Sequence, residues 1–155
     1  MKAAAILAGL ALAAASVTAQ AQQRPEYGPE VTIAAAKKIA AGTIAECAAN
    51  KWNVAVAVVD NHGFLVYFER MANTQTASVE IAVGKARTAA TYRRTTRVFM
   101  EVINKGPATA TLPQVVASPG GVPIFADGKV IGAVGVSGVT GDQDEQCAKA
   151  GIAGM

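Results

Sequence analysis

The sequence is poor in the residues that build metal and nucleophilic centres. Its 155 residues include a single histidine, His62, and two cysteines, Cys47 and Cys147. Structural zinc sites use four histidine or cysteine ligands, so this composition argues against a dedicated zinc site. Neither cysteine belongs to a CxxC pair, which removes support for a redox motif. A P-loop, a dinucleotide-binding fingerprint and a catalytic triad motif are also missing, so no defined reaction is indicated.

Charge is scarce and nearly balanced. Charged residues make up 16% of the chain, and the formal net charge is +3. Without residues 1–21, which contain Lys2, the chain has 13 basic and 11 acidic side chains. The basic residues between 85 and 97 spread around an expected helix instead of forming a stripe. Nucleic-acid binding is therefore not expected.

Only one long apolar run is present, and it lies at the N-terminus. Lys2 precedes an alanine-rich stretch that ends in the small-x-small sequence Ala19-Gln20-Ala21. This pattern predicts a secretory signal peptide over residues 1–21. An uncleaved anchor is the alternative, but the run is short against the roughly 20 apolar residues of a membrane span. We expect a periplasmic or secreted protein whose mature form has no membrane span.

Export to an oxidising compartment suggests a structural role for the two cysteines. Cys47 lies on the buried stripe of the expected first helix, and Cys147 lies in the first turns of the expected last helix. If both helices cover the same face of a sheet, the two residues can approach within the roughly 7 Å between Cα atoms that a disulfide needs. We therefore predict a Cys47–Cys147 disulfide.

Hydrophobic spacing and turn residues divide the rest of the chain into helices and β-hairpins. A polar leader over residues 22–30 is followed by a domain over residues 31–155. Apolar spacing predicts helices at 31–49, at 76–100 and from a cap at Asp142 onward. Runs rich in β-branched residues around turn sequences predict hairpins at 53–70 and 122–138. In the loop between 104 and 121, residues 115–117 are a candidate for one very short strand. These elements predict an α+β fold, in which one antiparallel sheet of about five strands is flanked by helices.

One lysine lies on the core-facing side of the expected 76–100 helix. Lys85 shares this side with Thr88 and Ala89, whereas the arginines lie elsewhere around the helix. One interpretation is that the Lys85 stem runs along the helix and its ammonium reaches solvent. The interpretation we favour is that Lys85 lines a functional cleft. A buried ammonium then needs a partner: an acidic side chain, loop carbonyls or the carboxylate of a ligand.

Neighbouring residues can complete an anion-binding site around Lys85. Ser78 lies on the same helix face two turns earlier, and Gly120-Gly121 can present backbone N–H groups. Such a site suits a haem propionate or a small organic acid. Asp144 and Glu145 are interpreted instead as acids at the start of the last helix, near the positive end of its dipole.

The chain resembles the GlcG/HbpS family over about residues 31–151. The resemblance is carried by four blocks in order and at similar spacing: VAVVDNHGFLVYFERM, SVEIAVGKARTAATY, GGVPIFADGKVIGAVGVSG and DEQCAKAG. It implies a profilin-like fold and homo-oligomers built from dimers, up to octamers. Extracellular members bind haem, and one secreted member degrades haem and signals to a sensor kinase. Other members are encoded with glycolate oxidation or form the C-terminal domain of a cobalamin-associated protein.

The resemblance breaks after the second strand. Many members read Arg-Met-Asp-Gly-Ala there, whereas this chain reads Arg70-Met71-Ala72-Asn73-Thr74. Arg70 joins the candidate ligand-binding residues, which are Lys85, Ser78, Arg70, Gly120 and Gly121.

Haem binding, which the resemblance implies, requires an axial iron ligand such as histidine, methionine, cysteine or tyrosine. His62, at the tip of the first hairpin, is the candidate. The alternative is that Asn-His-Gly is turn chemistry and the ring lies in water. Tyr67 and Tyr92 are expected to be core aromatics, and Met71 is a weaker candidate.

Three functions follow from these residues and from the resemblance. The first is an exported haem-binding protein, with or without slow haem breakdown. The second is an enzyme that acts on a small organic acid or aldehyde, with Lys85 in its site. The third is an accessory or sensory protein whose binding state is read by a membrane receptor.

Overall fold

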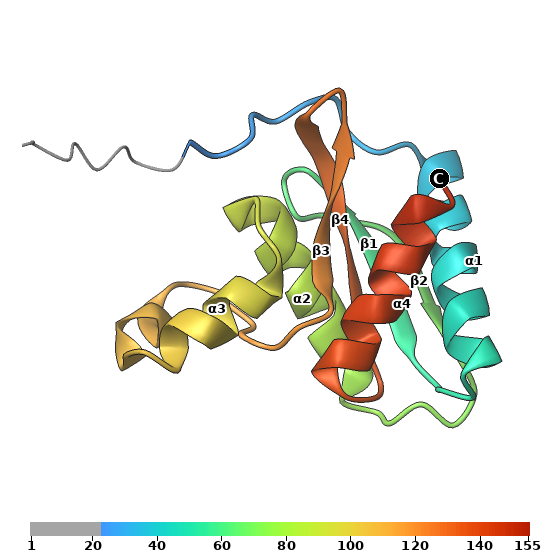
Figure 1. Ribbon diagram of the computed structural model, residues 1–155. Coiled ribbons are helices and arrows are strands. Elements are labelled where there is room, and N and C mark those ends of the chain that lie inside the picture. The colour runs from blue at the N-terminus through green and yellow to red at the C-terminus, as the bar shows by residue number, and fades with distance from the viewer. Residues whose placement is uncertain (1–22) are drawn as a thin grey trace, which may run out of the picture.

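The computed structural model describes residues 23–155 and consists of one sheet with helices on both faces (Figure 1). The predicted signal peptide lies outside the described residues. Within residues 23–155, no helix has both the length and the apolar character needed to cross a bilayer. The elements, in chain order, are α1 (Ile33–Ala49), β1 (Ala55–Asp60), β2 (Leu65–Arg70), α2 (Ser78–Tyr92), α3 (Thr96–Ile103), the 3₁₀ helix η1 (Pro107–Thr111), β3 (Gly121–Ala126), β4 (Lys129–Ser137) and α4 (Gly141–Ala153).

The sheet has four antiparallel strands in the order β2-β1-β4-β3, one fewer than predicted. The expected short strand at 115–117 is irregular backbone. Residues 24–31, which we call the strap, run along β4 and include most of the polar leader. The strap forms one parallel bridge, between Tyr27 and Val130, and Val130 N donates to Glu26 O at 2.8 Å. The leader is therefore packed on the body of the domain.

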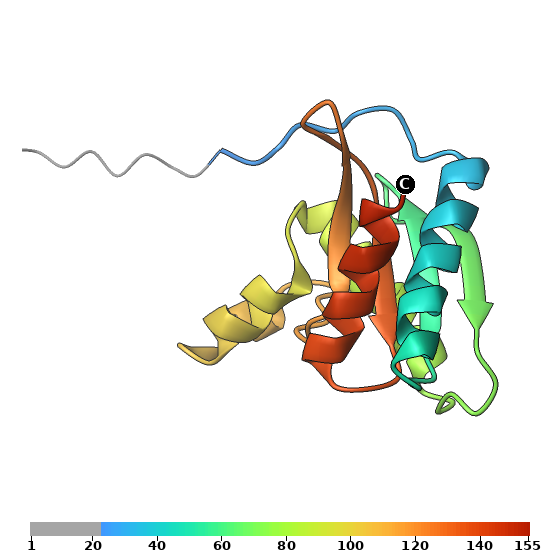
Figure 2. The same cartoon turned by 45° about the vertical axis from the view of Figure 1, so that its right-hand side comes forward.

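The central strand β1 is buried on both faces, as its continuous apolar sequence predicts. Its valines at 56 and 58 pack in a core with α1 and α4, whereas Ala55, Ala57 and Val59 pack against the alanines of α2. Figure 2 shows α1 and α4 side by side on one face of the sheet, with α2 behind it. The sheet therefore separates two apolar layers.

The helix α2 lies close to β4 because both elements carry small residues at the contact. A Cβ atom added at Gly135 would overlap the backbone of Ala82 and Ala86. Ala82, Ala86 and Ala89 are fully buried in this seam. The glycines of β4 thus allow the α2 backbone to approach the sheet directly.

The single helix predicted for residues 76–100 is wrong, because the helix breaks at Arg93. Arg93 adopts a left-handed conformation, with φ 55° and ψ 42°, and α3 starts three residues later. Its Nη1 atom donates to Pro25 O at 3.0 Å, and its guanidinium lies 4.9 Å from the centre of the Tyr27 ring. Contacts with the strap, distant in sequence, accompany this break. Beyond it, α3 and η1 extend away from the sheet as an arm (Figures 1 and 2).

The last helix is capped by Thr140, not by the predicted Asp142. The Thr140 side chain accepts from Gln143 N, and the Gln143 side chain accepts from Thr140 N, which makes a capping box. The predicted disulfide between Cys47 and Cys147 is present, and its Cα atoms are 5.6 Å apart. It joins α1 to α4 on one face of the sheet.

Candidate functional site

Lys85 is buried and paired with an acidic side chain. Only 2% of the side chain is exposed, so the interpretation in which the ammonium reaches solvent is wrong. The Nζ atom donates to Asp144 Oδ2 at 2.7 Å and to Val136 O at 3.0 Å. This contact joins α2 to β4 and α4 across the edge of the core. Of the three partners considered for the ammonium, the structure therefore supplies an acidic side chain and a backbone carbonyl.

The glycine pair lies against Lys85, as predicted. A Cβ atom at Gly120 would lie 2.8 Å from Asp144 Cβ and 3.0 Å from Lys85 Nζ. Gly120 also has φ 122°, a conformation that favours glycine. The Gly121 N–H does not face an anion, because it donates to Thr96 Oγ1 at 2.9 Å. The pair thus closes over the Lys85–Asp144 contact.

Asp144 is the acidic partner of Lys85, a role that sequence analysis missed. Burial raises the pKa of its carboxyl group, and hydrogen bonds from Lys85, Val139 N and Gly138 N oppose this shift. The carboxylate belongs to the first turn of α4, as interpreted. It also stabilises a lysine that lies 59 residues away in sequence. No local pattern indicates such a partner.

The other two candidate ligand-binding residues do not contact the Lys85 ammonium. Ser78 is buried at the start of α2, where its hydroxyl oxygen accepts from Ser137 Oγ at 3.2 Å. Arg70 is exposed at the end of the edge strand β2, and β1 separates that strand from β4. In the motif after Arg70, Asn73 has φ 62°. Asparagine tolerates this left-handed conformation, so it can stand where many family members have glycine.

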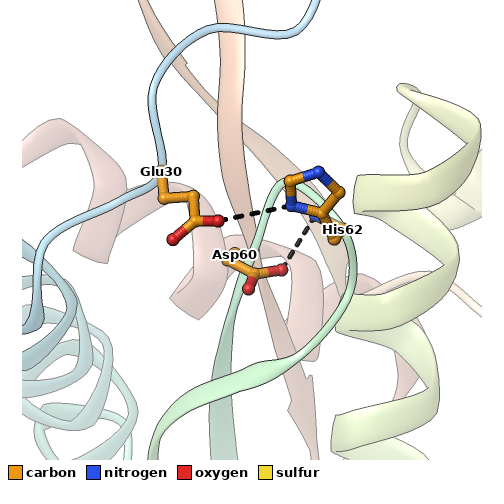
Figure 3. Close-up of side chains that lie close together, drawn as sticks. All are labelled: Glu30, Asp60 and His62. Carbon is orange, nitrogen blue, oxygen red and sulfur yellow. Dashed lines mark hydrogen bonds and ion pairs between the residues drawn. The ribbon is translucent and has the colours of Figure 1, made fainter.

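His62 lies at a turn that Asp60 braces (Figure 3). Asp60 Oδ1 accepts from His62 N at 2.8 Å and from Phe64 N at 2.9 Å. Gly63 completes the turn with φ 90°. The His62 side chain is 64% exposed. The turn chemistry predicted for Asn-His-Gly is therefore confirmed, and the imidazole projects from a rigid support.

Glu30, on the strap, approaches the same ring. Its Oε1 atom lies 3.4 Å from His62 Nδ1, so the carboxylate stands behind one ring nitrogen (Figure 3). Glu30, Asp60 and His62 each place one possible metal ligand within 4.8 Å of the other two. Three such ligands fall short of the four of a structural zinc site, and Asp60 already braces the turn. A carboxylate at Nδ1 favours the tautomer whose Nε2 lone pair is free to bind iron.

The tyrosine hydroxyls, which are the alternative iron ligands, are already engaged. Tyr27 OH donates to Thr91 O at 2.9 Å, and Tyr92 OH donates to Pro113 O at 2.9 Å. Tyr67 OH donates to Glu69 Oε2 at 3.0 Å, and the hydrogen bond and charge of Glu69 raise the pKa of Tyr67, which disfavours the phenolate. Met71 packs against the core, and both cysteines are in the disulfide.

Comparison with known proteins assigns the family. The family described as "Haem degrading protein HbpS-like" matches residues 31–153. The chain belongs to the HbpS-like family. Protein GlcG of Escherichia coli K12 is 46% identical to this HbpS-like chain over 100 residues, which cover 64% of the chain and 74% of GlcG. The predicted resemblance is therefore confirmed.

Solved structures confirm the fold of the HbpS-like chain. A double mutant of HbpS from Streptomyces reticuli is 31% identical, with a TM-score of 0.77, and the match covers 91% of this chain and 97% of that protein. A PduOC–haem complex is 26% identical, with a TM-score of 0.75, over 81% of this chain and 95% of PduOC. The α+β class with a central antiparallel sheet is thus correct.

Proposed function

We propose that this HbpS-like protein binds haem and that His62 supplies the axial ligand. The proposal is carried by one observation: a braced, exposed histidine, with a carboxylate behind Nδ1, in a chain of a haem-degrading family. The haem complex of the relative PduOC supports haem as the bound group. Bound haem supplies iron chemistry that the side chains of this protein do not have.

The surroundings of His62 suit a haem group. Phe64 and Leu65 follow the histidine closely in sequence and are 69% and 51% exposed, so exposed apolar side chains adjoin this turn in the chain. Asp60 fixes the backbone of the turn, and Glu30 orients the imidazole. A carboxylate partner of this kind fixes the tautomer and the ring orientation of a histidine ligand. The described residues therefore offer an iron ligand, a support for it and an apolar contact surface.

Lys85, the central residue of the alternative in which the protein is an enzyme for a small organic acid or aldehyde, is not free to bind a substrate. Lys85 Nζ is held by Asp144 and Val136, so an organic acid would have to displace a buried carboxylate. We therefore place no substrate at Lys85. Slow haem breakdown is the finer proposal, because haem on an exposed turn stays open to an external oxidant. Loss of haem absorbance after addition of hydrogen peroxide, faster with the protein than with free haemin, tests it.

Export and self-association complete the proposal. Cleavage of residues 1–21 would deliver the protein to the periplasm or the medium, where the Cys47–Cys147 disulfide is stable. The intact mass of the secreted protein tests cleavage, and a mass that includes Met1 would contradict it. Analytical ultracentrifugation tests the expected homo-oligomer with and without haemin, and a monomer under both conditions would contradict it.

Titration with haemin tests the proposed ligand. We expect the wild type to produce a saturable Soret shift, and the His62→Ala variant to lose it or to show a different spectrum. Tyr67→Phe is the control, because it removes a hydroxyl that Glu69 already occupies. Identical spectra for wild type and His62→Ala would remove His62 from the haem site.

A further inference from the structure

Three arginines meet where the strap crosses the end of α2. Arg24, Arg93 and Arg94 line one hollow of about 110 Å³, and the remaining lining residues are Gln23, Pro25 and Val98. Among residues 23–155, no aspartate or glutamate lines this hollow. Across residues 23–155, none of the three guanidinium groups forms an ion pair. The hollow therefore concentrates positive charge that the described chain does not neutralise.

The arginines are held in place by other contacts. Arg24 Nη1 donates to Tyr92 O at 3.2 Å, and Arg93 Nη1 donates to Pro25 O at 3.0 Å, so the strap and the helix end hold each other. The Arg93 guanidinium lies over the Tyr27 ring. The Arg94 guanidinium lies 5.5 Å from the centre of a second ring, that of Phe99. Donors anchored in this way are pre-organised and lose little freedom when a ligand binds.

One donor of the cluster lacks an acceptor. Arg93 Nε is buried, and no atom of the described residues accepts a hydrogen bond from it. A buried donor without a partner is costly, and such groups usually have a bound water, ion or ligand. The carbonyl end of α2 contributes only about half a negative charge. This end of the helix therefore does not balance three guanidinium groups.

We propose that this hollow binds a compact oxyanion, a carboxylate or a phosphate group. Each presents two oxygens that can accept the paired N–H groups of one arginine. Pockets for whole organic ligands span about 300–1,000 Å³, so a hollow of this size holds a single anionic group. That group is either a free anion or the anionic end of a larger molecule.

Calorimetric titration with inorganic phosphate and with succinate, each at fixed ionic strength, tests the site. We expect the wild type to bind at least one of the two anions. Arg94→Gln should weaken that binding by about tenfold or more, since it removes a charge-assisted donor. The control is Lys38→Gln, which removes an exposed positive charge on α1 and should leave the affinity unchanged. Circular dichroism melting checks that both variants fold.

Three results would overturn the proposal: binding of neither anion by the wild type, equal affinity of the wild type and Arg94→Gln, or equal weakening by Lys38→Gln. Because these titrations contain no haem, their outcome does not depend on the proposed function. A parallel haemin titration identifies the source of the group. Weaker haemin binding by Arg94→Gln assigns the hollow to a propionate, and unchanged haemin binding with weaker anion binding assigns it to a free anion.

Discussion

The inner face of α2 and its C-terminal end differ in whether the chain supplies an acidic partner for their positive charges. On the inner face, Lys85 is 2% exposed and its ammonium meets a carboxylate and a carbonyl of the same chain. At the end, Arg93 and Arg94 join Arg24 around a hollow without an acid. A buried charge whose partner lies in the chain is part of the structure, whereas charges that the fold gathers without a partner are available to a ligand.

The largest expected effect on the free energy of unfolding comes from breaking the buried Lys85–Asp144 ion pair. Lys85→Met leaves the Asp144 carboxylate buried without its ammonium, and loss of one partner of a buried pair costs about 3–5 kcal/mol. The free energy of unfolding, measured with denaturant, should fall by this amount. A change near zero would show that the contact does not hold the fold.

The double variant Lys85→Met/Asp144→Leu sharpens this test. Replacement of both partners by apolar residues is often neutral, so we expect most of the lost free energy of unfolding to return. Failure to recover would mean that Lys85 or Asp144 also supports the fold through other contacts, such as that from Val139 N to Asp144 Oδ1.

Removal of the disulfide between α1 and α4 gives an uncharged reference for the stability of the same helix. The bond closes a loop of 100 residues, and loss of a native disulfide typically costs about 2–5 kcal/mol. We expect the Cys47→Ala/Cys147→Ala variant to unfold at a lower denaturant concentration. Two free thiols in the denatured, non-reduced wild type would show that the bond does not form.

The pH dependence of Lys85→Met provides a finer comparison. Burial raises the pKa of Asp144 above its ordinary value of 3.8, and loss of the opposing lysine should raise it further. The native state then retains this proton to higher pH than the unfolded state, so stability present at low pH is lost as the pH rises through the native pKa. The deficit of Lys85→Met should therefore be smaller at about pH 4 than at about pH 7. An equal deficit at both values would contradict this.

The smallest expected effect concerns an exposed group. Glu30→Gln removes the carboxylate behind His62 Nδ1 and should lower haemin affinity by about tenfold, the lower limit for loss of a metal ligand's partner. Glu26→Gln is the matched control, because Glu26 lies on the same strap but pairs with Lys129. If both variants weaken binding equally, Glu30 does not act through His62.

Much of the fold could be predicted because its determinants are local. The β-branched strand runs, the turn at Asp127-Gly128 and the buried stripe around Cys47 depend on residues close in sequence, and both hairpins and the disulfide were correct. The meeting of Lys85 with Gly120 also followed from its place on the core side of the helix.

Two of the misses depend on partners distant in sequence. The position of Asp144 at a helix start already explained an acidic residue there, and no neighbouring residue indicated its contact with Lys85. Arg93 ends α2 in a conformation that local sequence assigns to glycine or asparagine, and its partners lie on the strap, 68 residues away. In the single helix predicted for residues 76–100, the arginines were spread around the helix. The break at Arg93 places Arg93 and Arg94 at one hollow.

The most direct test of the account is a haemin titration of three proteins, followed by absorbance: the wild type, His62→Ala and Lys85→Met/Asp144→Leu. We predict that His62→Ala loses the Soret shift of the wild type. The double variant should retain it, because in the wild type Lys85 and Asp144 pair with each other and neither charge is left for a ligand. A Soret shift that survives in His62→Ala and disappears in the folded double variant would contradict the account and return the site to Lys85.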